Sequence, residues 1–422
     1  MTKPSILTVI RRRNPFLLWL GQLVSTLGDN FEYIALMALA YHLSGSTLVM
    51  GAVLVSYMVP NLVLAVFSSV MMDRWDRRKT MIYSDVIRGL IILIPPVLLL
   101  LGKLQIWHLY LYSALYGCVT PFFNNANAAL LPSLVKEEEY LAMNSLMQTS
   151  IQLAGIIGLA LGGTAIAFLG YANAYFFDSF SFFFSAATVF LLKLPKKVMG
   201  GQPSEFQLTK FLKSWWTDFL DGLRFYKIEK SLLWLLLVVS VVNFAFGPLS
   251  ILLLPFVENF LGASVKEFGW IMSSVSLGTF LGAIFIGSIG IIRNRRRWIL
   301  VAVAAISILT MCLPSVRLFP LTMAVLFGIG FSLPLANIPI ATVFQEKVPD
   351  SLRGRVFGAR NFLAQSLSPV STALGGMLAD LIGVPLTIFL CGVLAFSVLV
   401  PSIFIPHLYG LNLQTKVEGR TE

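Results

Sequence analysis

Two carboxylates stand in the middle of the first long apolar stretch of the chain. Asp29 and Glu32 lie within residues 17–43, a stretch long enough to cross a bilayer, which takes about 20 mostly apolar residues. On a helix, Gln22, Ser25 and these two acids follow one another at steps of three, four and three residues, so all four share one face. A charge at the bilayer centre costs about 2.5 to 3.5 kcal/mol on insertion scales. This face is therefore expected to point into a protein-lined or water-filled cavity.

The chemistry open to such acids is proton exchange. Asp178 is a third acid inside a predicted span, and Arg88, near Asp85 toward the inner end of its span, is the one base. Without a basic partner, burial favours the neutral form of a carboxyl group, which can then release its proton to outside water or exchange it for a cationic ligand. We predict Asp29 and Glu32 as the proton-coupling or substrate residues, with Asp178 as an accessory. The alternative for Asp29 is a structural role, in which its neutral carboxyl group is hydrogen-bonded to neighbouring Ser or Asn side chains.

The elements that must position these acids are transmembrane helices, so the predicted fold class is all-α integral membrane. The chain has 422 residues, of which 57% are hydrophobic and 12% charged, whereas a soluble domain carries about 25% charged residues. No cleavable signal peptide is predicted, because the first apolar span is longer than the apolar segment of a signal. Apolar runs of spanning length predict twelve helices, at 16–43, 47–72, 80–101, 106–131, 143–169, 172–193, 231–257, 266–290, 298–314, 319–344, 356–382 and 384–406.

The net charge of +11 indicates topology rather than nucleic-acid binding. With both termini inside, the basic clusters fall on the inner side, and the outer loops keep only Lys103, Lys266 and Arg317. This asymmetry satisfies the positive-inside rule and predicts that both termini are cytoplasmic. We expect a monomer whose partners are the lipid bilayer, protons and a small-molecule substrate, and no nucleic acid.

The two halves of the chain look like copies of one six-helix unit. Gly162-Gly163 and Gly375-Gly376 are each followed, eight residues after the first glycine, by another glycine at the predicted outer turn. Such parallel repeats are typical of transporters whose site lies at the midplane between the halves. The linker contains an amphipathic helix with an aromatic face, suited to the inner membrane surface or, alternatively, to a regulatory partner. The predicted domains are an N-terminal bundle (1–194), a cytoplasmic linker (195–230) and a C-terminal bundle with a short tail (231–422).

Two further groups of side chains are predicted to serve transport. Acids and bases at a cytosolic edge can latch two helices in one conformation and release them in another, although a basic loop can also serve topology alone. The predicted gating residues are Asp73, Arg74, Arg77, Arg78, Asp85 and Arg88. The predicted cavity-lining residues, polar or aromatic members of the spans, are Gln22, Tyr33, Tyr57, Asn61, Asn124, Asn127, Asn243, Asn337 and Gln365.

The segment DRWDRRK, between the second and third predicted spans, resembles the inner-loop signature of the major facilitator superfamily. WLGQLVSTLGD in the first span, FFDSFS around Asp178 and VPDSLRGRVFG before the eleventh span are similar to the bacterial branch that contains macrolide efflux pumps and the enterobactin exporter. The resemblance runs through nearly the whole chain and implies two pseudo-symmetric six-helix halves. It also implies that Asp73 faces the positive N-terminal end of the eleventh helix, while Arg74, Arg77 and Arg78, together with Asp85, stabilise the outward-open state.

Two departures from the pattern of the superfamily bear on proton coupling. The fifth span reads AGIIGLALGG, with Leu159 where antiporter members carry a proline. The fourth span lacks the arginine of many drug antiporters and presents Asn124, Asn125 and Asn127 as its polar face. A coupling scheme that depends on that arginine is therefore excluded.

The residues and the resemblance together predict a secondary active transporter of the bacterial inner membrane. It is expected to export amphipathic or cationic small molecules, such as macrolide-like drugs, by proton antiport with alternating access, and so to act in antibiotic resistance. The alternative is an exporter or flippase of a dedicated endogenous solute such as a siderophore or lysophospholipid. A sensor or scaffold would not need the central acids. The sequence has no Walker phosphate loop, nucleophile elbow or zinc-protease helix, so we expect no enzyme. The 3 cysteines and 3 histidines are scattered, so no metal or cofactor is expected.

Overall fold

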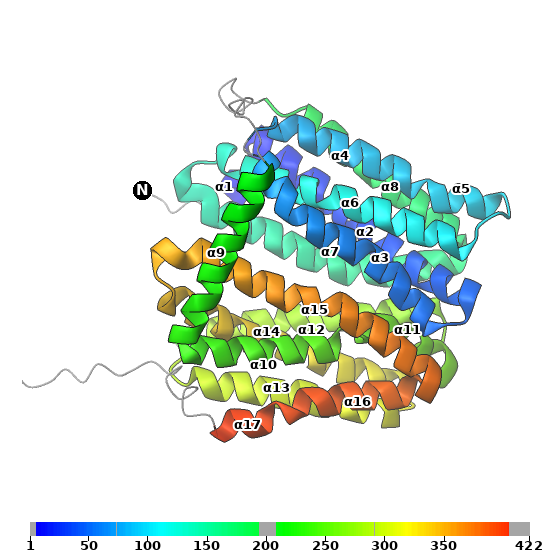
Figure 1. The fold of residues 1–422 in the computed structure, drawn as a ribbon. Helices are drawn as coiled ribbons and strands as arrows, with labels where there is room; N and C mark the ends of the chain where they lie inside the picture. The colour runs from blue at the N-terminus through cyan, green and yellow to red at the C-terminus, as the bar shows by residue number, and fades with distance from the viewer. Residues whose placement is uncertain (1–5, 73, 194–207, 291, 405–422) are drawn as a thin grey trace, which may run out of the picture. The chain divides into compact units, whose positions relative to one another are not determined.

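The computed structural model describes residues 6–72, 74–193, 208–290 and 292–404, and their secondary structure is helical throughout (Figure 1). Short 3-10 turns and one π-helical turn, Phe256–Phe260, connect or extend the α-helices. The α-helices are α1 (Ile6–Ile10), α2 (Arg13–Ser44), α3 (Thr47–Met71), α4 (Arg77–Ile92), α5 (Ile94–Leu100), α6 (Ile106–Leu130), α7 (Tyr140–Leu169), α8 (Tyr171–Phe190), α9 (Leu208–Ile228), α10 (Lys230–Phe246), α11 (Leu249–Pro255), α12 (Val265–Ser288), α13 (Arg295–Cys312), α14 (Phe319–Lys347), α15 (Arg353–Ile382), α16 (Val384–Ser397) and α17 (Leu399–Phe404).

Within the described ranges, eight helical segments are long and apolar enough to cross a membrane. The four remaining predicted spans are the more polar helices α2, α6, α8 and α15, each long enough to cross as well. The prediction of an all-α integral membrane fold is confirmed. The eight segments are Thr47–Met71, Arg77–Leu100, Glu137–Leu169, Lys230–Phe260, Val265–Ser288, Arg295–Ser315, Phe319–Lys347 and Val384–Ser402.

Three predicted spans are interrupted near a proline. The span predicted at 80–101 divides after Ile92, four residues before Pro96. The span predicted at 231–257 divides at Gly247-Pro248, and the span predicted at 384–406 divides after Ser397, four residues before Pro401. Proline has no N–H to donate and its ring clashes with the carbonyl four residues earlier, so a helix tends to end there.

The described chain forms two compact units, and the domain boundaries predicted at 194 and 230 stay a prediction. The first unit takes the described residues within Met1–Glu205, Ile251–Ser273 and Thr372–Asp380, and the second takes those within Phe206–Ser250, Ser274–Ser371 and Leu381–Glu422. In the first unit α2 packs along both α7 and α8, and α3 packs along α6 (Figure 1). The acid-bearing helix α2 therefore packs mainly against two helices from its own half of the sequence.

The segments 251–273 and 372–380 join the first unit through polar contacts at helix ends. Asp380 accepts a hydrogen bond from the backbone N–H of Thr47 (2.8 Å) and caps the first turn of α3. The Thr47 hydroxyl donates to the Gly376 carbonyl (2.9 Å). His42 near the end of α2 contacts Glu258 (2.9 Å). These contacts fix both ends of the connection between α2 and α3.

In the second unit, the amphipathic helix α9 packs against α15 rather than presenting its whole aromatic face to lipid. The rings of Trp215 and Phe219 lie edge-on to Phe362, with centroid distances of 5.7 and 5.5 Å. Arg355 at the start of α15 pairs with Asp218 (2.8 Å) on the same helix as the two rings. The prediction of an amphipathic helix is right, but much of its aromatic face serves protein packing because Phe362 offers it an apolar partner.

Candidate functional site

The two acids of α2 are each bound by a tyrosine of α6. The Tyr116 hydroxyl donates to Asp29 Oδ1 (2.9 Å), and the Tyr112 hydroxyl donates to Glu32 Oε1 (2.8 Å). Tyr112 and Tyr116 are four residues apart and share a face of α6, as the acids share a face of α2. Glu32 is buried and Asp29 half-buried. The polar face of α2 thus points at protein, and the tyrosines were missed although their spacing in the sequence is helical.

Asp178 of α8 is fully buried against a glycine of α2. The Ser181 hydroxyl donates to Asp178 Oδ1 (3.0 Å), and Asp178 Oδ2 has no hydrogen-bond partner among the described residues. A Cβ atom placed on Gly28 would lie 2.3 Å from Asp178 Oδ1 and 2.4 Å from Ser181 Oγ. A side chain larger than glycine would therefore have to displace Asp178 and Ser181, and sequence reasoning missed Gly28.

Gly28→Ala is expected to lower the free energy of unfolding by about 1 to 3 kcal/mol, the usual cost of overpacking a tight interior. The new methyl group would displace Asp178 and Ser181 from α2. The matched control is Gly358→Ala, because Gly358 lies inside α15 with open space around its Cβ position. That control should be neutral or stabilising, since alanine is the better helix former. Unfolding by SDS titration measures both variants, and an unchanged Gly28→Ala midpoint would contradict the assignment.

Arg88 of α4 is buried and forms an ion pair with Asp85, one helical turn earlier. Its guanidinium group lies between the rings of Phe123 and Phe182, 4.2 Å from each centroid. The long arginine side chain thus reaches from α4 toward α6 and α8, while Asp29, Glu32 and Asp178 form no ion pair within the described part of the chain.

The other predicted gating residues follow one another in the sequence from the end of α3 to the first turn of α4. Asp73 lies outside the described residues, and Arg74 is half-buried after the end of α3. Arg77 donates to the carbonyl of Ala129 (2.9 Å), and Arg78 donates to that of Val189 (3.2 Å). These carbonyls belong to the last turns of α6 and α8, where a positive charge is favourable. The role in the outward-open state that the resemblance implies stays a prediction.

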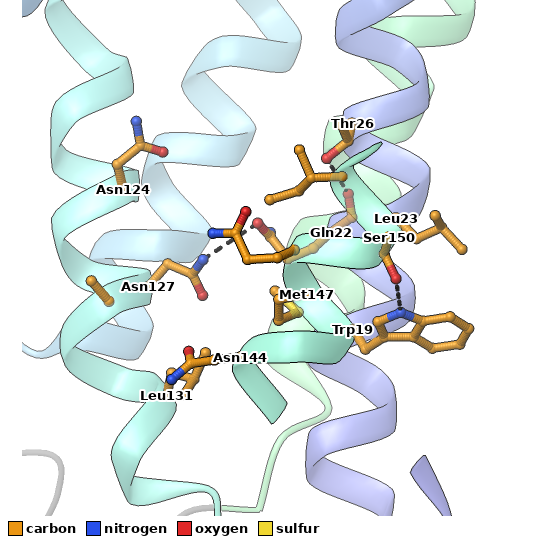
Figure 2. A pocket seen from close by; sticks show the side chains of 13 residues that line it. Trp19, Gln22, Leu23, Thr26, Asn124, Asn127, Leu131, Asn144, Met147 and Ser150 are labelled. Carbon is orange, nitrogen blue, oxygen red and sulfur yellow. Dashed lines mark hydrogen bonds between the residues drawn. The ribbon is translucent and has the colours of Figure 1, made fainter. Parts of the chain in front are cut away.

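A cavity of about 240 Å³ opens between α2, α6 and α7 of the first unit (Figure 2). Figure 2 shows Gln22 from α2 and Asn127 from α6 reaching toward each other, with Asn127 Nδ2 donating to Gln22 Oε1 (3.4 Å). Trp19 Nε1 donates to Ser150 Oγ (2.6 Å) and is fixed by that bond. The lining residues are Trp19, Gln22, Leu23, Thr26, Asn124, Asn127, Ala128, Leu131, Asn144, Met147, Gln148, Ser150 and Ile151.

The structure thus brings three of the predicted cavity residues, Gln22, Asn124 and Asn127, around one cavity. The other six lie elsewhere among the described residues. Tyr57 packs on Tyr116 with a centroid distance of 5.8 Å, and its hydroxyl accepts a hydrogen bond from Asn61 Nδ2 (3.3 Å). Tyr33 is half-buried on α2, and three predicted amides, Asn243, Asn337 and Gln365, are exposed in the second unit.

Sequence reasoning did not place Asn144, Gln148 and Ile151 at the cavity. They follow one another at steps of four and three residues on α7, so a shared face could have been read from the sequence. The helices that this face meets could not be read in the same way, because α2 is far from α7 along the chain: Trp19 and Ser150 are 131 residues apart.

Known proteins are similar to this chain in sequence and in fold. The sequence model of the family described as Major Facilitator Superfamily matches residues 18–372 and 249–416. The multidrug efflux pump Tap of Mycolicibacterium fortuitum is 27% identical over 96% of this chain and 99% of its own length. The macrolide efflux protein A of Streptococcus pyogenes is 22% identical over 94% and 97%. The crystal structure of a mutant of nucleoside transporter NupG superposes with a TM-score of 0.76 at 10% identity, covering 93% of this chain and 99% of that one.

Proposed function

The chain belongs to the major facilitator superfamily and is a multi-pass membrane transporter rather than an enzyme; from this premise we propose that it exports amphipathic or cationic small molecules by proton antiport. The efflux relatives support the direction of transport, because a multidrug pump and a macrolide efflux protein match nearly the whole chain. The expected location is a bacterial inner membrane, with both termini in the cytoplasm.

The observation that carries the coupling mechanism is the acid cluster of the first unit. Asp29, Glu32 and Asp178 are each held by a hydroxyl donor. A hydroxyl donor bonds a carboxylate and equally the carbonyl oxygen of a protonated carboxyl group. Each acid can therefore lose or gain its proton without losing its partner. The proposed cycle loads a proton on Glu32 from outside and releases it inside.

Ligand-linked proton release tests this proposal. Purified protein in weakly buffered detergent solution is mixed with tetraphenylphosphonium or erythromycin at matched pH, and a pH dye records proton release. The wild-type protein should release protons when ligand binds, because a bound cation competes with protons for the acids. The Asp29→Asn/Glu32→Gln variant should bind with little release. Ligand binding to wild type without any release would contradict antiport and favour the dedicated-solute exporter.

A further inference from the structure

We propose that the cavity between α2, α6 and α7 selects a neutral group that both donates and accepts hydrogen bonds, an amide or a hydroxyl, carried on an apolar body. The inference rests on the proposed export function and names the class of substrate that this part of the transporter takes. This cavity takes the uncharged end of the amphipathic cargo, and a cationic end would lie outside its lining.

The first argument is the absence of charge around the cavity. None of its thirteen lining residues is Asp, Glu, Lys, Arg or His. Asp29 and Glu32, which could attract a cation, point instead at Tyr116 and Tyr112 and are not part of the lining. An ionised group that enters an uncharged site loses hydration without gaining a counter-charge. The cavity therefore disfavours ions of either sign.

The second argument is the concentration of amide side chains. Asn124, Asn144 and Gln148 are exposed at the cavity. Their side chains make no hydrogen bond to any other residue in the part of the chain that the structure describes. Each amide offers a carbonyl acceptor and an NH₂ donor, and rotation of the amide plane exchanges the two. Three such groups match a ligand that offers both a donor and an acceptor.

The third argument is the amide pair of Gln22 and Asn127. Their mutual bond leaves Gln22 Nε2 and Asn127 Oδ1 buried without a partner among the described residues. If both amide planes are turned over, Gln22 donates to Asn127 instead, and one donor and one acceptor of the pair are again left without a partner. Buried polar groups in native proteins are nearly always hydrogen-bonded. If the two side chains turn toward a bound ligand, that ligand can accept a hydrogen bond from Gln22 Nε2 and donate one to Asn127 Oδ1.

The apolar part of the lining sets the body of the ligand. Leu23, Met147 and Ile151 line the cavity together with the ring of Trp19, which its bond to Ser150 fixes. The volume of about 240 Å³ is below the roughly 300–1,000 Å³ of sites for drug-sized ligands. The cavity therefore receives one end of a larger molecule, with its apolar surface on the wall and its polar group at the amides.

Four probes with the same ring test the selectivity. Saturation-transfer NMR on detergent-purified protein measures the dissociation constants of benzamide, N,N-dimethylbenzamide, benzylammonium and benzoate, with protein-free micelles as blank. Benzamide should bind at least about fivefold more tightly than the others, since each of them loses a hydrogen bond or adds a charge. Equal or tighter binding of an ionised probe would overturn the proposal, as would no saturation transfer to benzamide at its solubility limit.

Substitution of the three exposed amides tests whether the probes bind at this cavity. The combination Asn124→Leu, Asn144→Leu and Gln148→Met keeps side-chain size at exposed positions and should weaken benzamide about tenfold, abolishing its advantage over the dimethyl analogue. The matched control is Asn173→Leu, an exposed amide in the first turn of α8 outside the cavity. A triple variant that keeps the wild-type preference would overturn the proposal. The assay uses no proton gradient, so a failure of antiport leaves its result unchanged.

Discussion

Glu32→Gln is expected to reduce proton-driven export by at least about a hundredfold, the lower end of what a positioned acid–base group contributes to a rate. The variant keeps the size of the side chain and the acceptor for the Tyr112 hydroxyl, so the packing between α2 and α6 is retained. What it removes is the exchangeable proton. Everted membrane vesicles measure the effect, because a proton gradient, acidic inside, should drive uptake of a fluorescent lipophilic cation by wild-type protein and not by the variant.

Two controls separate the proton from the hydrogen bond and from surface charge. Tyr112→Phe removes the donor to Glu32 but leaves the carboxyl group, so it should slow transport far less than Glu32→Gln does. Glu138→Gln removes an exposed acid before α7 and should have no effect. Gradient-driven uptake by Glu32→Gln at the wild-type rate would show that Glu32 is structural, and Asp29→Asn would then become the decisive variant.

Arg88→Met is expected to lower the free energy of unfolding by about 3 to 5 kcal/mol, because breaking a buried ion pair leaves its partner charge uncompensated. Asp85 is fully buried, and Arg88 is its ion-pair partner. The substitution also removes the cation from between Phe123 and Phe182, and desolvated cation–π contacts contribute about 2 kcal/mol each. SDS titration of purified protein, followed by circular dichroism, measures the loss.

A double-mutant cycle isolates the ion pair from the packing. Asp85→Leu/Arg88→Met replaces both charges by apolar side chains, and such exchanges are often close to neutral. The double variant should therefore unfold closer to wild type than either single variant does. Arg224→Met breaks an exposed pair with Asp221 and should cost about 1 kcal/mol or less. Additive losses at Asp85 and Arg88 would mean that the two charges do not stabilise each other.

Several features followed from the sequence alone because they depend on neighbours within one helix. The polar face of α2 was predicted from the spacing of Gln22, Ser25, Asp29 and Glu32, since a helix brings such residues together wherever it packs. The amphipathic helix in the linker was predicted for the same reason. The long apolar runs predicted the spans, but run length ignores the missing N–H of proline, so the breaks near Pro96 and Pro401 were missed.

Only the tertiary structure decided which residues contact the polar face of α2. Tyr112 and Tyr116 are 80 and 87 residues from the acids they bind, and Gly28 meets Asp178 from another helix. Helical periodicity states which residues share a face, but it carries no information on which distant face will be opposite. The rings of Phe123 and Phe182, which Arg88 contacts from α4, were likewise not predicted, because sequence position does not show where a long side chain ends. Contacts between distant helices depend on close packing of whole surfaces, which only the folded bundle determines.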